Sequence, residues 1–400
     1  MKATTRPLSE FTDAALDLND VAAGDGYLFV RNAVGMAGRG VAARVPIDEA
    51  VTVLAALPND STVDGVAPVA LGVLGFSPGA PATVVIPQVL VRKFANGEAA
   101  VTVCGDLDED AVSAMLAARP TPDATASSYR IEPGVAVEQY LAAVAAARDA
   151  VRAGALTKAV IARPIVVHSS EPIDVHAVLR RLRASFGSSY RYSIDGFIGA
   201  SPELLVEVDG PVVRSHPLAG TAPRTGDVDN DARIAADLVA STKNQIEHRI
   251  VIDVVHDTLL PWASYLDWEP EPSIVTVANV QHLGTRMEGM LSQPGPSVIE
   301  LVRALSPTPA LGGHPRDVAI ELIERVEGFE RGRYGGAVGW VDADGNGTWA
   351  VAIRCAELSD DRRSARLIAG GGIVADSEPL AELAETQAKF QAMLSAIVRP

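Results

Sequence analysis

Apolar and polar positions alternate in short runs over the first hundred residues, a period-2 pattern typical of half-buried β-strands. The runs at 24–36 and 40–47 predict two strands. The stretch 82–105 predicts a hairpin that turns at Asn96-Gly97, a dipeptide that tight β-turns favour. This part of the chain is therefore expected to be rich in β-sheet, and no group of catalytic residue types stands out in it.

Helical spacing joins the strand pattern further along the chain. Residues 106–133 lose the strand period and predict a short helix with a surface loop, and 135–154 predict an amphipathic helix that ends in Gly. Beyond residue 155 strands and helices alternate. Strands are expected within 157–168, 197–218, 335–358 and 366–374, and helices over 174–186, 231–260 and 379–398.

Neighbouring strands joined by tight turns are typical of antiparallel sheets with helices packed on the outer faces. We therefore predict an α+β fold in which antiparallel β-sheets pack face to face with helices on the outside. Residues 1–134 are interpreted as a strand-rich part of one large domain and residues 135–400 as its catalytic region. A dinucleotide fold is not supported, because no strand leads through GxGxxG directly into a helix.

The composition excludes several classes of function. Four hundred residues, 48% of them hydrophobic and 21% charged, are typical of a folded protein with a sizeable core. A net charge of −16 repels phosphate backbones and anionic lipids, so neither nucleic acid nor a membrane is an expected partner. Two cysteines indicate a reducing compartment, and we expect the cytoplasm. No run of about twenty apolar residues predicts a membrane span.

Some charged residues occupy positions where the pattern calls for apolar ones. In the helix predicted over 231–260, Glu247 shares a face with Ile250, Val251 and Val254. A lone buried carboxylate is costly, so Glu247 should have a cationic partner. A core ion pair with an Arg or Lys is one interpretation, and a metal ion is the other.

The final predicted helix repeats this signal with several acids. Glu378, Glu382, Glu385 and Lys389 follow one another at spacings of four, three and four residues, which places three carboxylates along one side. Carboxylates from two helices, without a His or Cys cluster, suit a hard ion that keeps water and substrate ligands, which favours Mg²⁺. The alternative is a solvated acidic face.

Three further residues are candidates for acid, base or anion-binding roles. Lys158 alternates with Val160 and Ala162 on one face of a predicted strand, where desolvation would favour a neutral amine able to act as a base. The alternative is a lysine on an edge strand that reaches solvent. Arg354 alternates with small residues, which leaves room for a planar carboxylate. Glu203 follows a strand that breaks at a proline, where it is either an acid or a turn residue.

Several long motifs contain these residues, and together they resemble the chorismate-utilising enzymes, most closely the isochorismate synthases. The resemblance covers roughly residues 135–395. The motifs are LTKAVIAR (156–163), IGASPELLVEV (198–208), HPLAGTAPR (216–224), KNQIEH (243–248), VQHLGT (280–285), PTPALGG (307–313), YGGAVGWVDADGNGTWAVAIRC (334–355), AGGGIV (369–374) and PLAELAETQAKF (379–390).

The resemblance implies a reaction in which a nucleophile adds at C2 of chorismate while the C4 hydroxyl leaves, with Mg²⁺ on the C1 carboxylate. It implies that Lys158 is the general base that activates water and that Glu203 is the general acid. Glu247 and Glu385 match the metal ligands, with Glu382 close by. The positions that match substrate contacts, or that the motifs place near the pocket, are Gly220, Thr221, His282, Ala310, Tyr334, Arg354, Gly372 and Lys389.

The resemblance also separates activities within the family. Aminating members generally have a non-basic residue at the Lys158 position and work with a glutaminase, so water is the expected nucleophile and no glutaminase partner is expected. Ala310, Leu311 and Ile353 are similar to isochorismate synthases. Tyr334 also occurs in salicylate synthases, which go on to eliminate pyruvate, so salicylate synthesis is the alternative.

A non-catalytic homologue is a third hypothesis. It rests on Ser306 and Asn244, which stand where isochorismate synthases often have His and an acidic residue.

The product of an active enzyme could enter siderophore or menaquinone synthesis. We expect a monomer, because no exposed face shows the pattern of an obligate interface.

Overall fold

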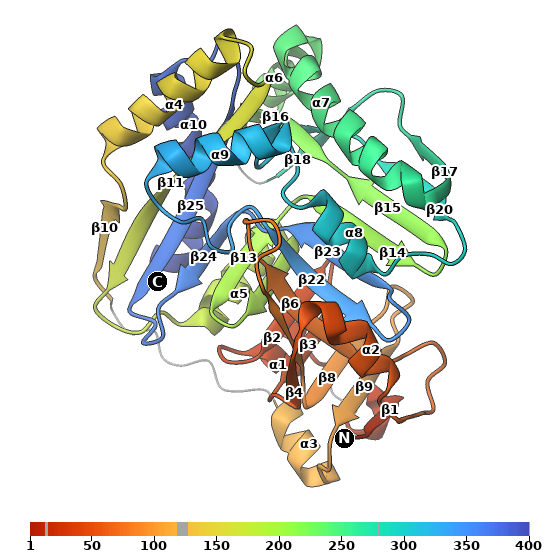
Figure 1. The fold of residues 1–400 in the computed structure, drawn as a ribbon. Coiled ribbons are helices and arrows are strands. Elements are labelled where there is room, and N and C mark those ends of the chain that lie inside the picture. Colours follow the sequence, from red (N-terminus) through yellow and green to blue (C-terminus); the bar gives the residue numbers. More distant parts are fainter. Residues whose placement is uncertain (13–14, 118–126, 278–279, 400) are drawn as a thin grey trace.

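Two large β-sheets and one small sheet form the body of the protein, and most helices lie outside them (Figure 1). The computed structural model describes residues 1–12, 15–117, 127–277 and 280–399. All pairings within the described sheets are antiparallel except that between β1 and β5.

The first sheet has thirteen strands and contains both the N-terminal strands and those that carry the last motifs. Its spatial order is β10 (Tyr129–Pro133), β11 (Lys158–Ser169), β25 (Ser364–Ile373), β24 (Cys355–Leu358), β13 (Phe197–Ser201), β12 (Tyr190–Ile194), β2 (Tyr27–Arg31), β3 (Val34–Arg39), β8 (Val89–Lys93), β9 (Ala99–Cys104), β1 (Ala3–Pro7) and β5 (Asn59–Ser61), with β21 (Gly313–His314) beside β11.

The other two sheets are smaller. The second has the order β17 (Ala263–Trp268), β20 (Met287–Leu291), β15 (Val212–His216), β14 (Leu204–Asp209), β23 (Gly347–Val351), β22 (Ala337–Asp342), β6 (Val69–Leu74), β7 (Thr83–Ile86) and β4 (Ala43–Pro46). The third consists of β16 (Leu218–Pro223), β19 (Val280–Gly284) and β18 (Ser273–Thr276).

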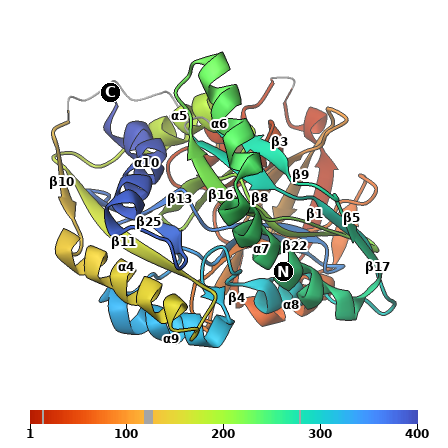
Figure 2. The ribbon, with the colours of Figure 1, turned by 90° about the horizontal axis from the view of Figure 1, so that it is seen from above.

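The helices form groups on different sides of the sheets. Figure 2 shows α4, α9 and α10 together on one side and α6, α7 and α8 on the other. The helices are α1 (Leu18–Ala22), α2 (Ala50–Ala55), α3 (Glu109–Leu116), α4 (Val137–Arg152), α5 (Val175–Phe186), α6 (Val228–Ala240), α7 (Thr242–Leu259), α8 (Val298–Leu305), α9 (Arg316–Glu327) and α10 (Pro379–Val398). No helix of the described ranges is long and apolar enough to cross a membrane.

The main core lies between the two large sheets. It combines Met36 and Phe197 from the first sheet with Leu71, Val338 and Trp349 from the second, all less than 2% exposed. Their burial removes a large apolar area from water and holds the sheets face to face, as the sequence predicted. Strands that precede residue 134 are members of both sheets, since β2 pairs with β12 and β6 with β22.

Some sequence expectations about elements were wrong. The run 24–36, expected to be one strand, contains β2, a turn at Asn32-Ala33 and the start of β3. The helix expected over 231–260 is two helices, because Ser241 adopts an extended backbone and its hydroxyl accepts a hydrogen bond from Asn244 N at 3.4 Å, which starts a new helix. The strand expected over 366–374 is longer, since β25 begins at Ser364 and runs through all three glycines. There Gly370 and Gly372 pair with β11.

Candidate active site

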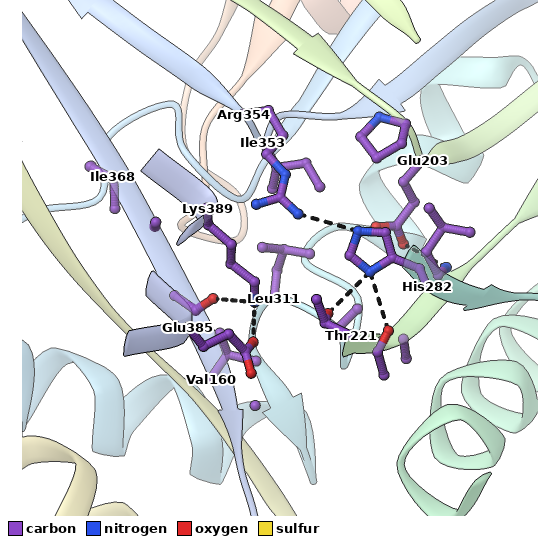
Figure 3. Close-up of a pocket in the computed structure, with 18 of the residues that line it drawn as sticks. Val160, Glu203, Thr221, His282, Leu311, Ile353, Arg354, Ile368, Glu385 and Lys389 are labelled. Atoms are coloured by element: carbon purple, nitrogen blue, oxygen red, sulfur yellow. Dashed lines mark hydrogen bonds and ion pairs between the residues drawn. The ribbon is translucent and has the colours of Figure 1, made fainter. Parts of the chain in front are cut away.

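A cavity of about 250 Å³ lies where β11, β25, α7, α10 and the bend before β14 meet. All thirteen residues that the sequence predicted for the catalytic, metal and substrate site line it (Figure 3 draws part of this lining). They are Lys158, Glu203, Gly220, Thr221, Glu247, His282, Ala310, Tyr334, Arg354, Gly372, Glu382, Glu385 and Lys389. Segments more than two hundred residues apart in the sequence thus meet in one place.

Lys158 lies on the inside of the first sheet and is 1% exposed. Its strand, β11, has neighbours on both edges at this point, β25 on one side and β21 on the other, so the alternative of a solvent-reaching edge lysine was wrong. Its Nζ is 2.8 Å from Oε1 of Glu247 on α7. The core ion pair considered for Glu247 therefore exists, and its cation is a residue of the candidate site.

Glu203 occupies the bend between β13 and β14 and is 3% exposed. Burial raises the pKa of this carboxyl to about 8, although the Leu218 N–H, 3.4 Å from its Oε1, and the charges of Lys158 and Arg354 act in the opposite direction. At neutral pH most Glu203 side chains therefore carry a proton, which a general acid requires.

Arg354 lines the cavity, but it does not lie in a strand as the sequence predicted. Strand alternation was the basis for choosing it, but it lies between β23 and β24 with a positive φ of 53°, outside any strand. Its guanidinium Nη2 is 3.2 Å from Nε2 of His282 (Figure 3). The alternation argument was wrong although the residue is in the site.

His282 holds this guanidinium from β19. Burial and the charges of Arg354 and Lys389 lower the pKa of the imidazole to about 3, so the ring is neutral. Since Arg354 can only donate, Nε2 of His282 accepts, and the ring proton is on Nδ1. Nδ1 lies 3.2 Å from the Gly220 carbonyl, which accepts that proton, and 3.1 Å from Thr221 Oγ1.

The acidic residues of α10 differ in their surroundings. Glu378 is exposed and lies outside the cavity. Glu382 is 6% exposed, and its Oε2 has no hydrogen-bond partner among the described residues. Burial and then the charge of Glu385 raise the pKa of Glu382 to about 7. For Glu382 the alternative of a solvated acidic face was therefore wrong.

Lys389 partly neutralises the negative charge of these acids. Its Nζ is 2.5 Å from Oε1 of Glu385 and donates to the Gly370 carbonyl at 2.7 Å (Figure 3). Burial opposes the charged form of Glu385, but the charges of Lys389, Arg354 and Lys243 keep the pKa of this carboxyl below its usual value. Glu385 therefore stays ionised beside the largely buried Glu382.

The glycines of β25 make room for these carboxylates. A Cβ on Gly371 would lie 2.7 Å from Oε2 of Glu382, and one on Gly372 would lie 2.5 Å from Oε1 of Glu247. A side chain at either position would collide with the neighbouring carboxylate. The three acids that line this part of the cavity, Glu247, Glu382 and Glu385, are called the cradle.

The donor set of this cradle fits a hard divalent cation. Within the described ranges no three His, Cys, Asp or Glu side chains are close enough together to hold a metal ion by themselves. Mg²⁺ usually takes only one or two protein carboxylates and completes its shell with water and substrate oxygens. The unpartnered Oε2 of Glu382 and the oxygen-only chemistry of Glu247 and Glu385 meet that requirement.

Sequence reasoning missed one charged residue of the lining. Lys243 belongs to the same motif as Glu247 and precedes it by four residues, so the two share a face of α7. That spacing was available in the sequence and could have identified it.

Asn244 also lines the cavity, whereas Ser306 is buried outside it. Tyr334 is 5% exposed, and burial raises the pKa of its phenol.

Comparison with known proteins defines the class. Residues 79–398 match the family described as "Chorismate binding enzyme". The chain is 41% identical over 281 residues to isochorismate synthase DhbC of Bacillus subtilis, covering 68% of this chain and 70% of that protein. It is 35% identical over 354 residues to isochorismate synthase EntC of Escherichia coli, covering 86% and 84%.

A solved structure agrees at the level of the fold. The menaquinone-specific isochorismate synthase MenF of Escherichia coli superposes with a TM-score of 0.84 over 99% of this chain and 94% of that one, at 24% sequence identity. With most of its length matched by the family and by these relatives, the chain belongs to the chorismate-binding enzymes.

Proposed function

We propose that this protein is an isochorismate synthase, an isomerase that converts chorismate to isochorismate. The observation that carries the proposal is the placement of Lys158 and Glu203, both almost fully buried, in the wall of the cavity that three glutamates also line. Relatives named isochorismate synthase, matched over most of the chain, support the same activity.

In this mechanism the neutral amine of Lys158 takes a proton from water as the oxygen attacks C2 of chorismate, which requires that Glu247 no longer holds the ammonium form in its ion pair. The ring double bond shifts, the C4–O bond breaks, and Glu203 gives its proton to the departing hydroxyl, which leaves as water. One water enters and one leaves, so the product is an isomer of the substrate. The raised pKa of Glu203 provides the acid form at neutral pH.

We further propose that carboxylates from among Glu247, Glu382 and Glu385 would hold Mg²⁺ together with water and substrate oxygens, and that the ion would neutralise carboxylate charge at this end of the cavity. Four acidic side chains, Glu203 included, and four basic side chains line the cavity, and chorismate would add two carboxylates. Arg354 and Lys389 are the proposed partners of the substrate carboxylates. Gly220, Thr221, His282, Ala310, Tyr334 and Gly372 complete the substrate-binding wall.

The test is incubation of the purified protein with chorismate and Mg²⁺, followed by chromatography of the products. Isochorismate is the expected product. Salicylate together with pyruvate would establish the alternative of a salicylate synthase. Unchanged chorismate would support the hypothesis of a non-catalytic homologue. We propose that the enzyme works as a cytoplasmic monomer without a glutaminase, in siderophore or menaquinone synthesis.

The pH dependence of turnover should report the protonation of Glu203. Because burial raises its pKa to about 8 in the ligand-free protein, kcat/KM is expected to fall roughly tenfold per pH unit above that value as the proton is lost. The measurement is kcat/KM between pH 6 and pH 10 for the native enzyme and for Glu203→Gln. The variant should be slow with no decline in this range. A native profile that stays flat to pH 10 would exclude Glu203 as the acid.

Replacing His282 by phenylalanine should weaken the hold on Arg354. Phenylalanine keeps an aromatic ring but removes the Nε2 acceptor of the Arg354 hydrogen bond, together with the Nδ1 donor to the Gly220 carbonyl. We expect kcat/KM for chorismate to fall about tenfold, near the value of one charge-assisted hydrogen bond. His282→Gln, which restores an acceptor, should recover part of the loss. Equal kcat/KM for native enzyme and His282→Phe would contradict the assignment.

A further inference from the structure

A buried ion pair outside the cavity connects two parts of its wall. Glu327 ends α9 and Arg331 lies in the loop that follows, and they are 3% and 4% exposed. Arg331 Nε donates to Glu327 Oε2 at 2.9 Å, and its Nη2 donates to Oε1. Neither side chain lines the cavity.

The pair fills a gap in the hydrogen bonding of β11. One edge of this strand pairs with β21 at Lys158 and Ala159 and with β10 from Ile165 onward, and no described strand pairs with the stretch between. There the Ala162 N–H donates to Glu327 Oε1 at 2.7 Å, and the Val160 carbonyl accepts from Arg331 Nη2 at 2.6 Å.

The same guanidinium also bonds the segment that runs beside β11 and leads into β21. Arg331 Nη1 donates to the Leu311 carbonyl at 2.7 Å, and its carbon lies 4.3 Å from the centre of the Phe76 ring. Leu311 and Ala310 line the cavity, as does Val160, which follows Lys158 by two residues. One side chain thus reinforces the link between the lysine strand and the segment beside it, where the Val160 N–H also donates to the Gly312 carbonyl at 2.9 Å.

We propose that Glu327 and Arg331 are positioning residues that fix the backbone of Lys158 relative to the Ala310–Leu311 wall. The inference rests on the proposed function for its catalytic consequence. A buried ion pair contributes little net stability, because desolvation offsets its attraction, whereas its directional hydrogen bonds specify one arrangement. A base displaced by even a fraction of an ångström loses rate more than it loses substrate binding.

Arg331→Lys tests this proposal. Lysine keeps the charge beside Glu327 but cannot serve both carbonyls and both carboxylate oxygens with a planar fork. We expect kcat to fall at least about tenfold while KM for chorismate changes less than about threefold. The matched control is Arg39→Lys. Arg39 is also buried and joins a carbonyl, Val21 O, to a carboxylate, Asp25, in the N-terminal part of the chain.

Hydrogen exchange supplies a readout that does not depend on activity. Amides of 158–162 and 307–312 should exchange faster in Arg331→Lys than in native protein and Arg39→Lys. Glu327→Gln should change the same amides if Arg331→Lys fails to fold. Unchanged exchange, unchanged kcat in an active enzyme, or equal losses in Arg39→Lys would overturn the inference. Native protein that leaves chorismate unchanged would instead refute the proposed function.

Discussion

Replacing Lys158 by alanine is expected to lower kcat by about 10²–10⁴-fold, the range of a lost general base. The amine is buried at 1% exposure, so bulk buffer bases have little access to the water that it would activate. Neighbouring side chains are poor substitutes, since Glu247 is a proposed ligand of Mg²⁺ and Glu203 carries a proton at neutral pH. The measurement is initial isochorismate formation at saturating chorismate and Mg²⁺.

A second lysine provides the matched control for this experiment. Lys93 on β8 is half-buried, lies outside the cavity and donates to the Leu16 carbonyl, so Lys93→Ala should retain native kcat. The thermal midpoint of each variant should be measured as well, because removing Lys158 leaves the Glu247 carboxylate without its partner. Native kcat in a folded Lys158→Ala variant would exclude this lysine as the base.

The sequence predicted the site better than it predicted the elements that carry it. Lys158 and Glu247 were identifiable because a charged side chain on an apolar face is costly unless it has a partner or a function. This argument does not depend on the exact residue at which the strand or helix ends. Arg354 was chosen on strand alternation, yet its backbone leaves the strand with φ near 53°. The correct residue emerged because the long motif around it was specific, while the local geometry depended on tertiary contacts.

Other features could not be predicted from local patterns. The split between α6 and α7 depends on one serine hydroxyl, whose capping bond is a weak signal within a strongly periodic helical stretch. The Glu327–Arg331 pair depends on a stretch of β11, about 165 residues earlier in the chain, that no described strand pairs with on one of its two edges. Only the folded sheet shows that this stretch needs side-chain partners.

Removal of divalent cations is expected to abolish turnover, and Mg²⁺ is expected to restore it. Without a cation, the carboxylates of Glu247, Glu382 and Glu385 would face a substrate that carries two negative charges. Burial and the Glu385 charge already raise the pKa of Glu382 to about 7, which shows how unfavourable a further negative charge is here. The experiment measures chorismate conversion after EDTA treatment and again after titration with Mg²⁺.

Two acids of α10 distinguish a metal site from a general effect of charge. Glu382→Gln removes a buried carboxylate of the cradle, and the Mg²⁺ concentration for half-maximal rate should rise at least about tenfold, since a neutral amide is a weaker ligand for a hard cation. Glu378→Gln removes an exposed carboxylate outside the cavity and should leave that concentration unchanged. Full turnover in chelator would disprove the metal site, and equal shifts in both variants would mean that net charge, rather than coordination, sets the requirement.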